Sequence, residues 1–146
     1  MTAPNPTAVR RCVRAALADA GIDGAAVDLV NGHLTATGAD PSEVQSWSAA
    51  LDRGPGHFPT LTATKSLIGH TLGAAGAIES VATVLMLARR FAHPCRNSED
   101  LHAEIEPFAA SIPRETRELP GPRVAIKAGF GFGDVNACIV FRAWEA

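Results

Sequence analysis

Cysteine, tyrosine and clustered basic residues are scarce or absent in this sequence, and each gap excludes a class of protein. The sequence has three cysteines, Cys12, Cys95 and Cys138, an odd number without C-x-x-C spacing. Neither a disulfide framework nor a zinc site is therefore indicated. The formal net charge is -2 and the longest basic run is Arg-Arg, a pattern that favours neither nucleic acid nor an anionic membrane as a partner. We expect a cytoplasmic protein without a metal ion.

We also expect neither a signal peptide nor a membrane span. The first residues, MTAPNPTAVRR, lack the apolar core that secretion signals carry. The most apolar window, Leu72 to Ala88, is interrupted by one acidic and two hydroxyl side chains and is short for a bilayer. We therefore expect a soluble chain, and its 146 residues fit a single domain, residues 1–146.

Small and aliphatic residues are what the sequence has in abundance. It contains 13 glycines, and 47% of its residues are hydrophobic against 19% that are charged. This balance leaves few polar side chains for an exposed surface. We expect a partner to bury part of the chain.

Alternating helical and extended patterns predict an α/β chain. One helix begins with Thr7 as its N-cap and ends at Gly21, and a second begins at Asp40 in a capping box with Glu43. A long helix extends from about Leu72 to Arg90. The predicted strands are residues 27–31, 60–64, 103–108, 123–129 and 136–144.

The long helix has apolar residues around nearly its whole circumference from Gly73 to Arg90. A helix of this kind is buried on all sides. Its glycines and alanines permit close backbone contacts, which suits a helix held between two sheets. One domain of this length can hardly cover both sides of it, so we expect a second layer from elsewhere.

Three loops that follow predicted strands carry residues capable of chemistry. They contribute His33, Lys65, His70 and the backbone N–H groups of GFGFGD, residues 129–134. Sites in α/β sheets assemble at strand ends, and this set suits acyl or carbanion chemistry. His70 precedes a helix N-terminus, whose dipole disfavours imidazolium, so we expect a neutral hydrogen-bond donor there.

Each of these features also has a structural interpretation. A lone histidine in a loop is more often structural than catalytic, and a lysine such as Lys65 is usually exposed. The glycines of GFGFGD match the dinucleotide-binding G-x-G-x-x-G pattern only loosely, and a strand follows where that motif requires a helix. We exclude dinucleotide binding, while the histidines and the lysine taken singly fit a structural role as well as a catalytic one.

Three strings together resemble the C-terminal portion of the β-ketoacyl-acyl-carrier-protein synthases, the condensing enzymes of fatty-acid and polyketide synthesis with the thiolase fold. VNGHLTAT resembles the family's Asn-Ala-His-Gly-Thr-Gly-Thr loop, and GFGFGDVN resembles its Gly-Phe-Gly-Gly-Thr-Asn loop. TKSLIGHTLGAAGAIE matches its Thr-Lys-Ser-x-x-Gly-His signature and the helix that follows. The likeness covers about residues 4 to 142 and implies one half of the layered αβαβα thiolase architecture, a mixed sheet with a buried central helix.

The resemblance assigns catalytic roles to the histidines and the lysine. His33 and His70 would stabilise the enolate that forms when a malonyl thioester loses carbon dioxide. Lys65 would orient His70 through a hydrogen-bond network that includes Glu79. A partner of this kind would account for an acidic residue in an apolar helix.

Substrate-binding roles follow from the same resemblance. Thr35 and Thr37 match the threonines that hold the phosphopantetheine arm of an acyl carrier protein, so no cofactor of the chain's own is implied. The Phe130 N–H would form half of the oxyanion hole, and its ring would gate the acyl pocket.

The family's catalytic cysteine has no counterpart in this sequence. Family members are more than twice as long, and their nucleophile lies in an N-terminal half with which none of Cys12, Cys95 and Cys138 aligns. The strand that usually opens the C-terminal half is also absent. We therefore interpret the chain as the separately encoded half of a split ketosynthase, whose partner carries the cysteine in a heterodimer that pairs again into a two-fold assembly.

Leu34 and Asp134 stand where the family has glycines. If the backbone has a positive φ at these positions, the two residues strain or reshape their loops. The shape of the acyl pocket and its gating are the properties most affected.

Decarboxylative Claisen condensation is the first functional hypothesis, and three others stay open. One is acyl transfer without decarboxylation. Another is a non-catalytic partner, like a chain-length factor or a carrier-protein-binding subunit, although such a subunit has little reason to keep both histidines, the lysine and the glutamate. A fragment that folds alone is disfavoured by the long apolar helix. A specialised polyketide or polyene pathway fits a split enzyme better than housekeeping fatty-acid synthesis does.

Overall fold

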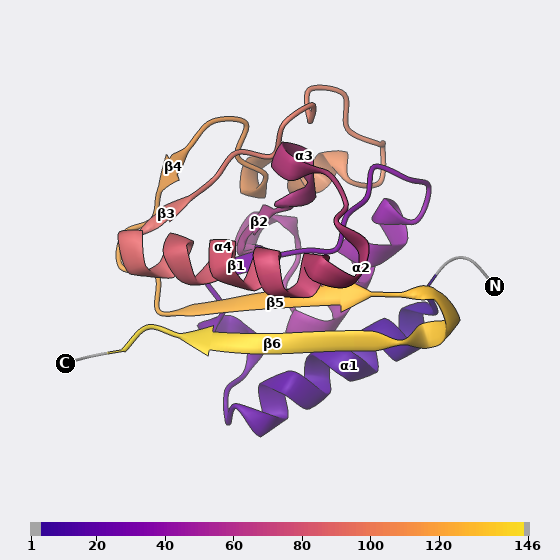
Figure 1. The fold of residues 1–146 in the computed structure, drawn as a ribbon, viewed down its shortest axis with the longest axis horizontal. Helices are drawn as coiled ribbons and strands as arrows, with labels where there is room; N and C mark the ends of the chain where they lie inside the picture. Colours follow the sequence, from indigo (N-terminus) through magenta and orange to yellow (C-terminus); the bar gives the residue numbers. More distant parts are fainter. Residues whose placement is uncertain (1–3, 145–146) are drawn as a thin grey trace.

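A computed structural model describes residues 4–144, which form a mixed sheet with helices on both faces (Figure 1). The helices are α1 (Pro6–Asp19), α2 (Asp40–Leu51), α3 (Lys65–Ile68) and α4 (Ala75–Arg89). The strands are β1 (Leu29–Asn31), β2 (Thr60–Thr62), β3 (Phe91–Ala92), β4 (Arg117–Glu118), β5 (Val124–Phe130) and β6 (Asn136–Arg142). Short 3-10 turns lie at Gly24–Ala26, Pro55–His57, Leu72–Ala74, Glu106–Ser111 and Phe132–Asp134.

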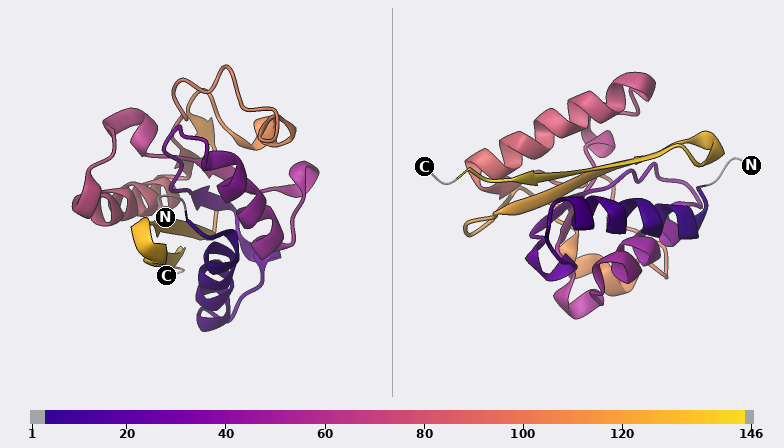
Figure 2. Two further views of the ribbon diagram at one scale, coloured as in Figure 1. Left: turned by 90° about the vertical axis from the view of Figure 1, so that its right-hand side faces the viewer. Right: turned by 90° about the horizontal axis from the view of Figure 1, so that it is seen from below.

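The main sheet has the strand order β2-β1-β5-β6. β1 is parallel to β2 and β5, whereas β6 is antiparallel to β5. β3 and β4 form a separate antiparallel pair. The sheet lies between α4 on one face and α1 and α2 on the other (Figure 2). The α/β class and the mixed sheet expected from the sequence are confirmed.

β1 illustrates how both faces of the sheet are filled. Val30 belongs to the core beneath α1 and α2, together with Val13 and Trp47. Its neighbour Leu29 packs on the other face with Met86 of α4. Successive strand residues point to opposite faces, so a strand buried throughout is one that is covered on both sides.

Within the described residues α4 is buried on one face only, in agreement with the expectation that this chain does not cover both sides of the helix. Glu79, Thr83 and Met86 lie against the sheet and are at most 1% exposed. The opposite face exposes a row of aliphatic side chains: Ile78 (40%), Val81 (61%), Val84 (46%) and Leu85 (42%). A helix that is apolar all round needs a layer on each side, and the described residues supply one of them.

The segment Leu72–Arg89 is long and apolar enough to cross a membrane by length and composition, contrary to the expectation that it is too short. Core helices of soluble proteins pass the same test. Glu79, in the middle of the segment, forms ion pairs inside the protein. These ion pairs favour a core helix.

Local details differ from the sequence prediction at two helix starts and one strand. α1 is capped by Asn5, whose side chain accepts the N–H of Thr7. Asp40 is the first residue of α2 rather than its N-cap, because its carboxylate binds N–H groups of the preceding loop. Glu106–Ser111 forms a 3-10 turn where the sequence predicts a strand, since Pro107 has no N–H for a strand ladder.

Candidate active site

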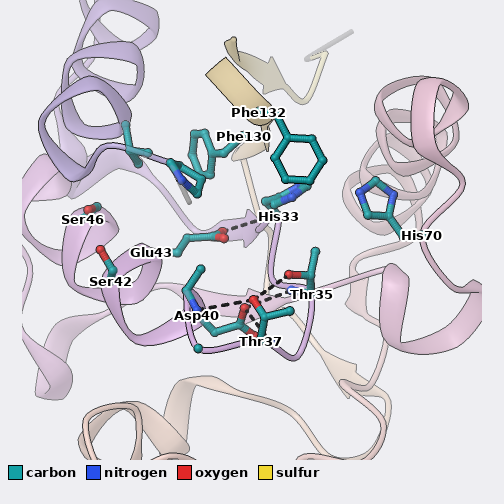
Figure 3. A pocket seen from close by; sticks show the side chains of 14 residues that line it. His33, Thr35, Thr37, Asp40, Ser42, Glu43, Ser46, His70, Phe130 and Phe132 are labelled. Atoms are coloured by element: carbon teal, nitrogen blue, oxygen red, sulfur yellow. Dashed lines mark hydrogen bonds between the residues drawn. The ribbon is translucent and has the colours of Figure 1, made fainter. Parts of the chain in front are cut away.

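The loops after β1 and β2 and the end of β5 bring five of the seven predicted site residues to one pocket (Figure 3). His33 and His70 meet edge to face, with 5.4 Å between their ring centroids. The Phe130 ring lies 6.2 Å from that of His33. Thr35 and Thr37 line the same pocket, whose volume is about 390 Å³.

His33 extends from the loop that follows β1 and is half-buried. Burial is the main cause that lowers the pKa of its imidazole to about 4, and the positive charges of Lys65 and Lys127 act in the same direction. The ring is therefore neutral at physiological pH and keeps one N–H donor.

His70 is exposed at the mouth of the pocket, just before the turn that leads into α4. Its Nδ1 accepts the backbone N–H of Leu72 at 3.1 Å. In a neutral ring this hydrogen bond assigns the proton to Nε2. Each of the two histidines can thus present one N–H donor to the pocket.

The loop that carries Thr35 and Thr37 is wrapped around Asp40. The Asp40 carboxylate accepts the N–H groups of Thr35 at 3.1 Å and Ala36 at 3.0 Å, and the two threonine Oγ1 atoms are 3.1 Å apart. Ala36 has a φ of 56° in this loop, whereas Leu34 is not among the described residues with positive φ. In this loop the positive φ that the sequence analysis considered for Leu34 is therefore found at Ala36 instead.

Glu43 supports the His33 loop from below, a role that the sequence did not indicate. Its Oε1 accepts the His33 N–H at 2.7 Å and the Trp47 Nε1–H at 3.2 Å, while Oε2 accepts the Leu34 N–H at 3.0 Å. Burial raises the pKa of this carboxyl to about 7, against the effect of these three donors. A Cβ at Gly32 would lie 2.9 Å from Oε1, so a larger residue there would displace the Glu43 carboxylate.

Lys65 and Glu79 form the buried ion pair that the resemblance implies, with 2.6 Å between Nζ and Oε1. Lys65 is 8% exposed and Glu79 is 1% exposed. Among residues 4–144, no hydrogen bond joins Lys65 to His70; the one described for His70 comes from Leu72. The second Glu79 oxygen is paired with Lys127 of β5, a residue that the sequence analysis missed.

A buried polar network lies behind these groups. The Asn31 side chain donates to the hydroxyls of Thr64 at 2.9 Å and Thr83 at 3.0 Å. Thr64 also contacts Nε2 of His93 at 3.0 Å, and Thr62 contacts its Nδ1 at 2.9 Å. Burial lowers the pKa of His93, so a neutral ring links β2 to the segment after β3. Nothing in the local sequence of His93 signals this contact.

The glycine-rich loop after β5 contains two phenylalanines in different settings. Phe130 is 3% exposed and its ring lies 6.1 Å from that of Trp47, whereas Phe132 is 79% exposed at the pocket mouth. Asp134 has a φ of 61°, as its glycine-like position predicts. Its carboxylate accepts the N–H of Asn5 at 2.8 Å and so joins the loop to the start of α1.

The strand order and the histidine loops at the strand ends define a condensing enzyme fold of the thiolase-like type. The family model described as "Beta-ketoacyl synthase, C-terminal domain" matches residues 1–99. The chain belongs to the β-ketoacyl synthase family and corresponds to the C-terminal portion of its members.

Relatives of known sequence and structure agree with this assignment. The 3-oxoacyl-[acyl-carrier-protein] synthase 1 of Haemophilus influenzae is 34% identical over 145 residues, which cover 99% of this chain and 34% of that protein. The chloroplastic 3-oxoacyl-[acyl-carrier-protein] synthase II of Arabidopsis thaliana is 35% identical over 148 residues, or 99% and 27% of the two chains. The chain therefore spans between 27% and 34% of the length of these relatives.

Solved structures show the same fold over nearly the entire chain. A β-ketoacyl synthase from Burkholderia phymatum aligns with a TM-score of 0.89 at 31% identity, covering 99% of this chain and 34% of that one. The ishigamide ketosynthase/chain length factor aligns with a TM-score of 0.89 at 27% identity and the same coverage.

Proposed function

We propose that this chain supplies the histidine part of a β-ketoacyl-acyl-carrier-protein synthase that joins acyl and malonyl thioesters by decarboxylative Claisen condensation. The facing pair of His33 and His70 at the pocket is the observation that carries this proposal. Two histidine side chains that line one pocket can supply N–H donors to an oxygen that becomes negative during a reaction.

The proposed reaction uses each residue for a step that its position permits. Thr35 and Thr37 hold the phosphopantetheine arm of the malonyl carrier. The bond between the α-carbon and the carboxylate breaks, carbon dioxide leaves, and the electron pair forms an enolate whose oxygen accepts the N–H groups of His33 and His70. The α-carbon then attacks the acyl thioester on a cysteine of the other half, and the cysteine sulfur leaves as a thiolate.

The cysteine-bearing half is proposed to come from a second polypeptide. Two observations support this partner: none of the three cysteines lines the pocket that holds both His33 and His70, and the outer face of α4 is apolar and exposed. The partner half would cover that face and pair with the open edge of β6. Two such heterodimers would form the two-fold assembly.

The gate over the acyl pocket is proposed to be Phe132 instead of Phe130. Residues 131–136 align in register with Gly-Phe-Gly-Gly-Thr-Asn, which places Phe132 at the phenylalanine of that motif. Its ring is exposed at the pocket mouth, whereas the ring of Phe130 is buried between His33 and Trp47.

The direct experiment measures carbon dioxide release from malonyl carrier protein by the complex with the N-terminal half. We expect His33→Ala and His70→Ala each to lower the rate by about a hundredfold or more, because an oxyanion donor is worth about 2.7 to 4 kcal/mol. His57→Ala, at an exposed position that does not line the pocket, serves as the control and should retain full activity. Unchanged release in the two pocket variants would contradict the proposal and favour a non-catalytic subunit.

A further inference from the structure

The only two lysines of this sequence converge on one carboxylate. Of 13 basic residues, eleven are arginines and two are lysines, Lys65 and Lys127. Lys65 comes from α3 and Lys127 from β5, and each pairs with a different oxygen of Glu79. Lys127 also donates to the carbonyl of Ala128. Both lysines are therefore buried residues of the site, while arginines supply the other basic side chains.

One lysine is enough to neutralise the negative charge of Glu79, and Lys127 is a second. Lys65 and Glu79 already form a balanced pair, so Lys127, which is 2% exposed, leaves the buried cluster with one positive charge in excess. Burial lowers the pKa of Lys127, and Glu79 opposes that change. An uncompensated buried charge is costly, and an apolar side chain of similar size would normally be more favourable for stability alone. A stabilising role by itself does not explain this lysine.

The sheet register places the excess charge beneath the histidines. Lys127 of β5 pairs in register with Asn31 of β1, and Asn31 lies two residues before His33. The Asn31 side chain and the Lys127 ammonium both contact Glu79, one at its carbonyl and the other at its carboxylate. Asn31, Lys127 and Glu79 therefore lie on one face of the sheet, under the start of the His33 loop.

We propose that Lys127 is a positioning residue of the condensing site: it holds the second oxygen of Glu79, and it adds a positive charge below His33 where the reaction forms an enolate. This inference rests on the proposed function. Lys127 does not line the described pocket, so it acts through Glu79 and through its charge. A lysine suits this place because its ammonium is a compact point charge.

The test compares Lys127→Met, Lys127→Arg and the exposed control Arg11→Met in the complex with the N-terminal half. Lys127→Met should lower carbon dioxide release by roughly tenfold or more, the range for residues that orient and polarise a first layer of active-site groups. Acylation of the partner cysteine, which needs no enolate, should change less than about twofold. Lys127→Arg keeps the charge but not the compact shape of the ammonium, and it should retain more of the release rate than Lys127→Met does.

A second readout separates this role from a structural one. The titration midpoint of His33, followed by NMR with isotope-labelled histidine, should rise in Lys127→Met and stay unchanged in Arg11→Met, because Lys127 is one of the charges that lower this pKa. Lys65, His70 and Glu79 also act on His33. They and Glu43 are present in every variant, so their effects cancel in the comparison.

Each outcome decides the proposal. An unchanged His33 midpoint together with unchanged carbon dioxide release in Lys127→Met overturns it, as does equal loss of acylation and release. If Lys127→Met does not fold, Lys127→Gln replaces it; if neither neutral variant folds, Lys127 is a stability residue and the proposal fails. If the unmodified complex releases no carbon dioxide, the proposed function fails, and the His33 titration still tests Lys127.

Discussion

The charges around the pocket are set by Glu43, Glu79 and His33. Glu43 holds the His33 loop by its backbone, Glu79 holds the two lysines, and His33 itself stays neutral. Asp40 and Glu43 line the pocket together with the two histidines. Both carboxylates accept backbone N–H groups of the loop that carries His33 and Thr35.

The Glu43→Gln variant should alter how stability depends on pH. The folded state raises the carboxyl pKa from 4.5 to about 7, so between these values the unfolded chain releases a proton that the folded chain keeps. The free energy of unfolding therefore falls as pH rises through this range, by about 3 kcal/mol for such a shift. Glutamine does not titrate and removes this decrease.

Urea denaturation of Glu43→Gln and of the unmodified chain, from about pH 4 to about pH 8, measures this effect. The readout is the difference between their free energies of unfolding at each pH. His33 acts in the opposite direction, because its lowered pKa makes stability rise between pH 4 and pH 6.5. Its contribution is present in both proteins. Parallel stability curves for Glu43→Gln and the unmodified chain would contradict the raised pKa of Glu43.

The two phenylalanines of the glycine-rich loop should respond differently to truncation. Phe130→Ala removes a buried ring and should lower the free energy of unfolding by about 3 to 5 kcal/mol. Phe132→Ala should change stability by less than about 0.5 kcal/mol and alter the rate of cysteine acylation, as expected of a gate. Denaturation curves measure the change in stability, and intact-mass kinetics measure the rate of acylation. The reverse pattern would identify Phe130, and not Phe132, as the gate.

Sequence alone could identify the residues of the site whose motifs are local, but not those joined by folding. His33, His70 and the Lys65–Glu79 pair follow from short strings and their resemblance. Lys127 and His93 lie far along the chain from their partners, and a buried lysine or histidine has no distinctive neighbours in sequence. The sequence analysis assigned Glu43 to the capping box of the helix that begins at Asp40. That assignment gave no indication of its contact with the His33 loop.

At the level of elements, sequence patterns predicted the long helices and the strands β1, β2, β5 and β6, while β3, β4 and α3 were not predicted. β3 and β4 contain two residues each, and α3 contains four, which is too short for a periodic signal. The two sides of α4 could not be distinguished because apolar residues surround nearly its whole circumference. Packing against β5 selects Glu79, Thr83 and Met86 as the inner face.

The outer face of α4 gives the clearest test of the partner. Val81→Asp places a charge in the middle of this face, at a side chain that is 61% exposed in the chain itself. The folded chain should tolerate it, but association with the N-terminal half should be lost, because a buried unpaired carboxylate opposes binding. Co-purification measures the loss.

Ala15→Asp on the exposed side of α1 is the matched control for this substitution. It adds the same charge to a helix on the other face of the sheet, and the complex should survive it. If Val81→Asp also leaves the complex intact, the outer face of α4 is not the surface that the partner covers.

At the scale of the whole molecule, composition predicted an incompletely covered chain, and the exposed aliphatic row on α4 agrees with it. The sequence could not identify which surface is open, because that depends on how α4 lies on the sheet. The fold and the family membership account for one half of a condensing enzyme. The other half is a proposal that association experiments can test.

Binding of the partner half should stabilise the chain by mass action. With free partner at roughly one hundred times its Kd, the free energy of unfolding should increase by about 2.7 kcal/mol. Thermal unfolding at increasing partner concentrations should therefore show a rising Tm. The Val81→Asp chain should show no such rise, and an unmodified chain with a constant Tm would speak against a heterodimer.

The most direct measurement of the central claim is intact-mass analysis of the co-expressed complex after addition of acyl and malonyl carrier proteins. The account predicts that the partner cysteine becomes acylated and that an extended β-ketoacyl product appears, while His33→Ala or His70→Ala permits acylation but abolishes extension. A complex that forms and acylates without extension would contradict condensation and favour acyl transfer. A complex that does neither would identify the chain as a non-catalytic subunit.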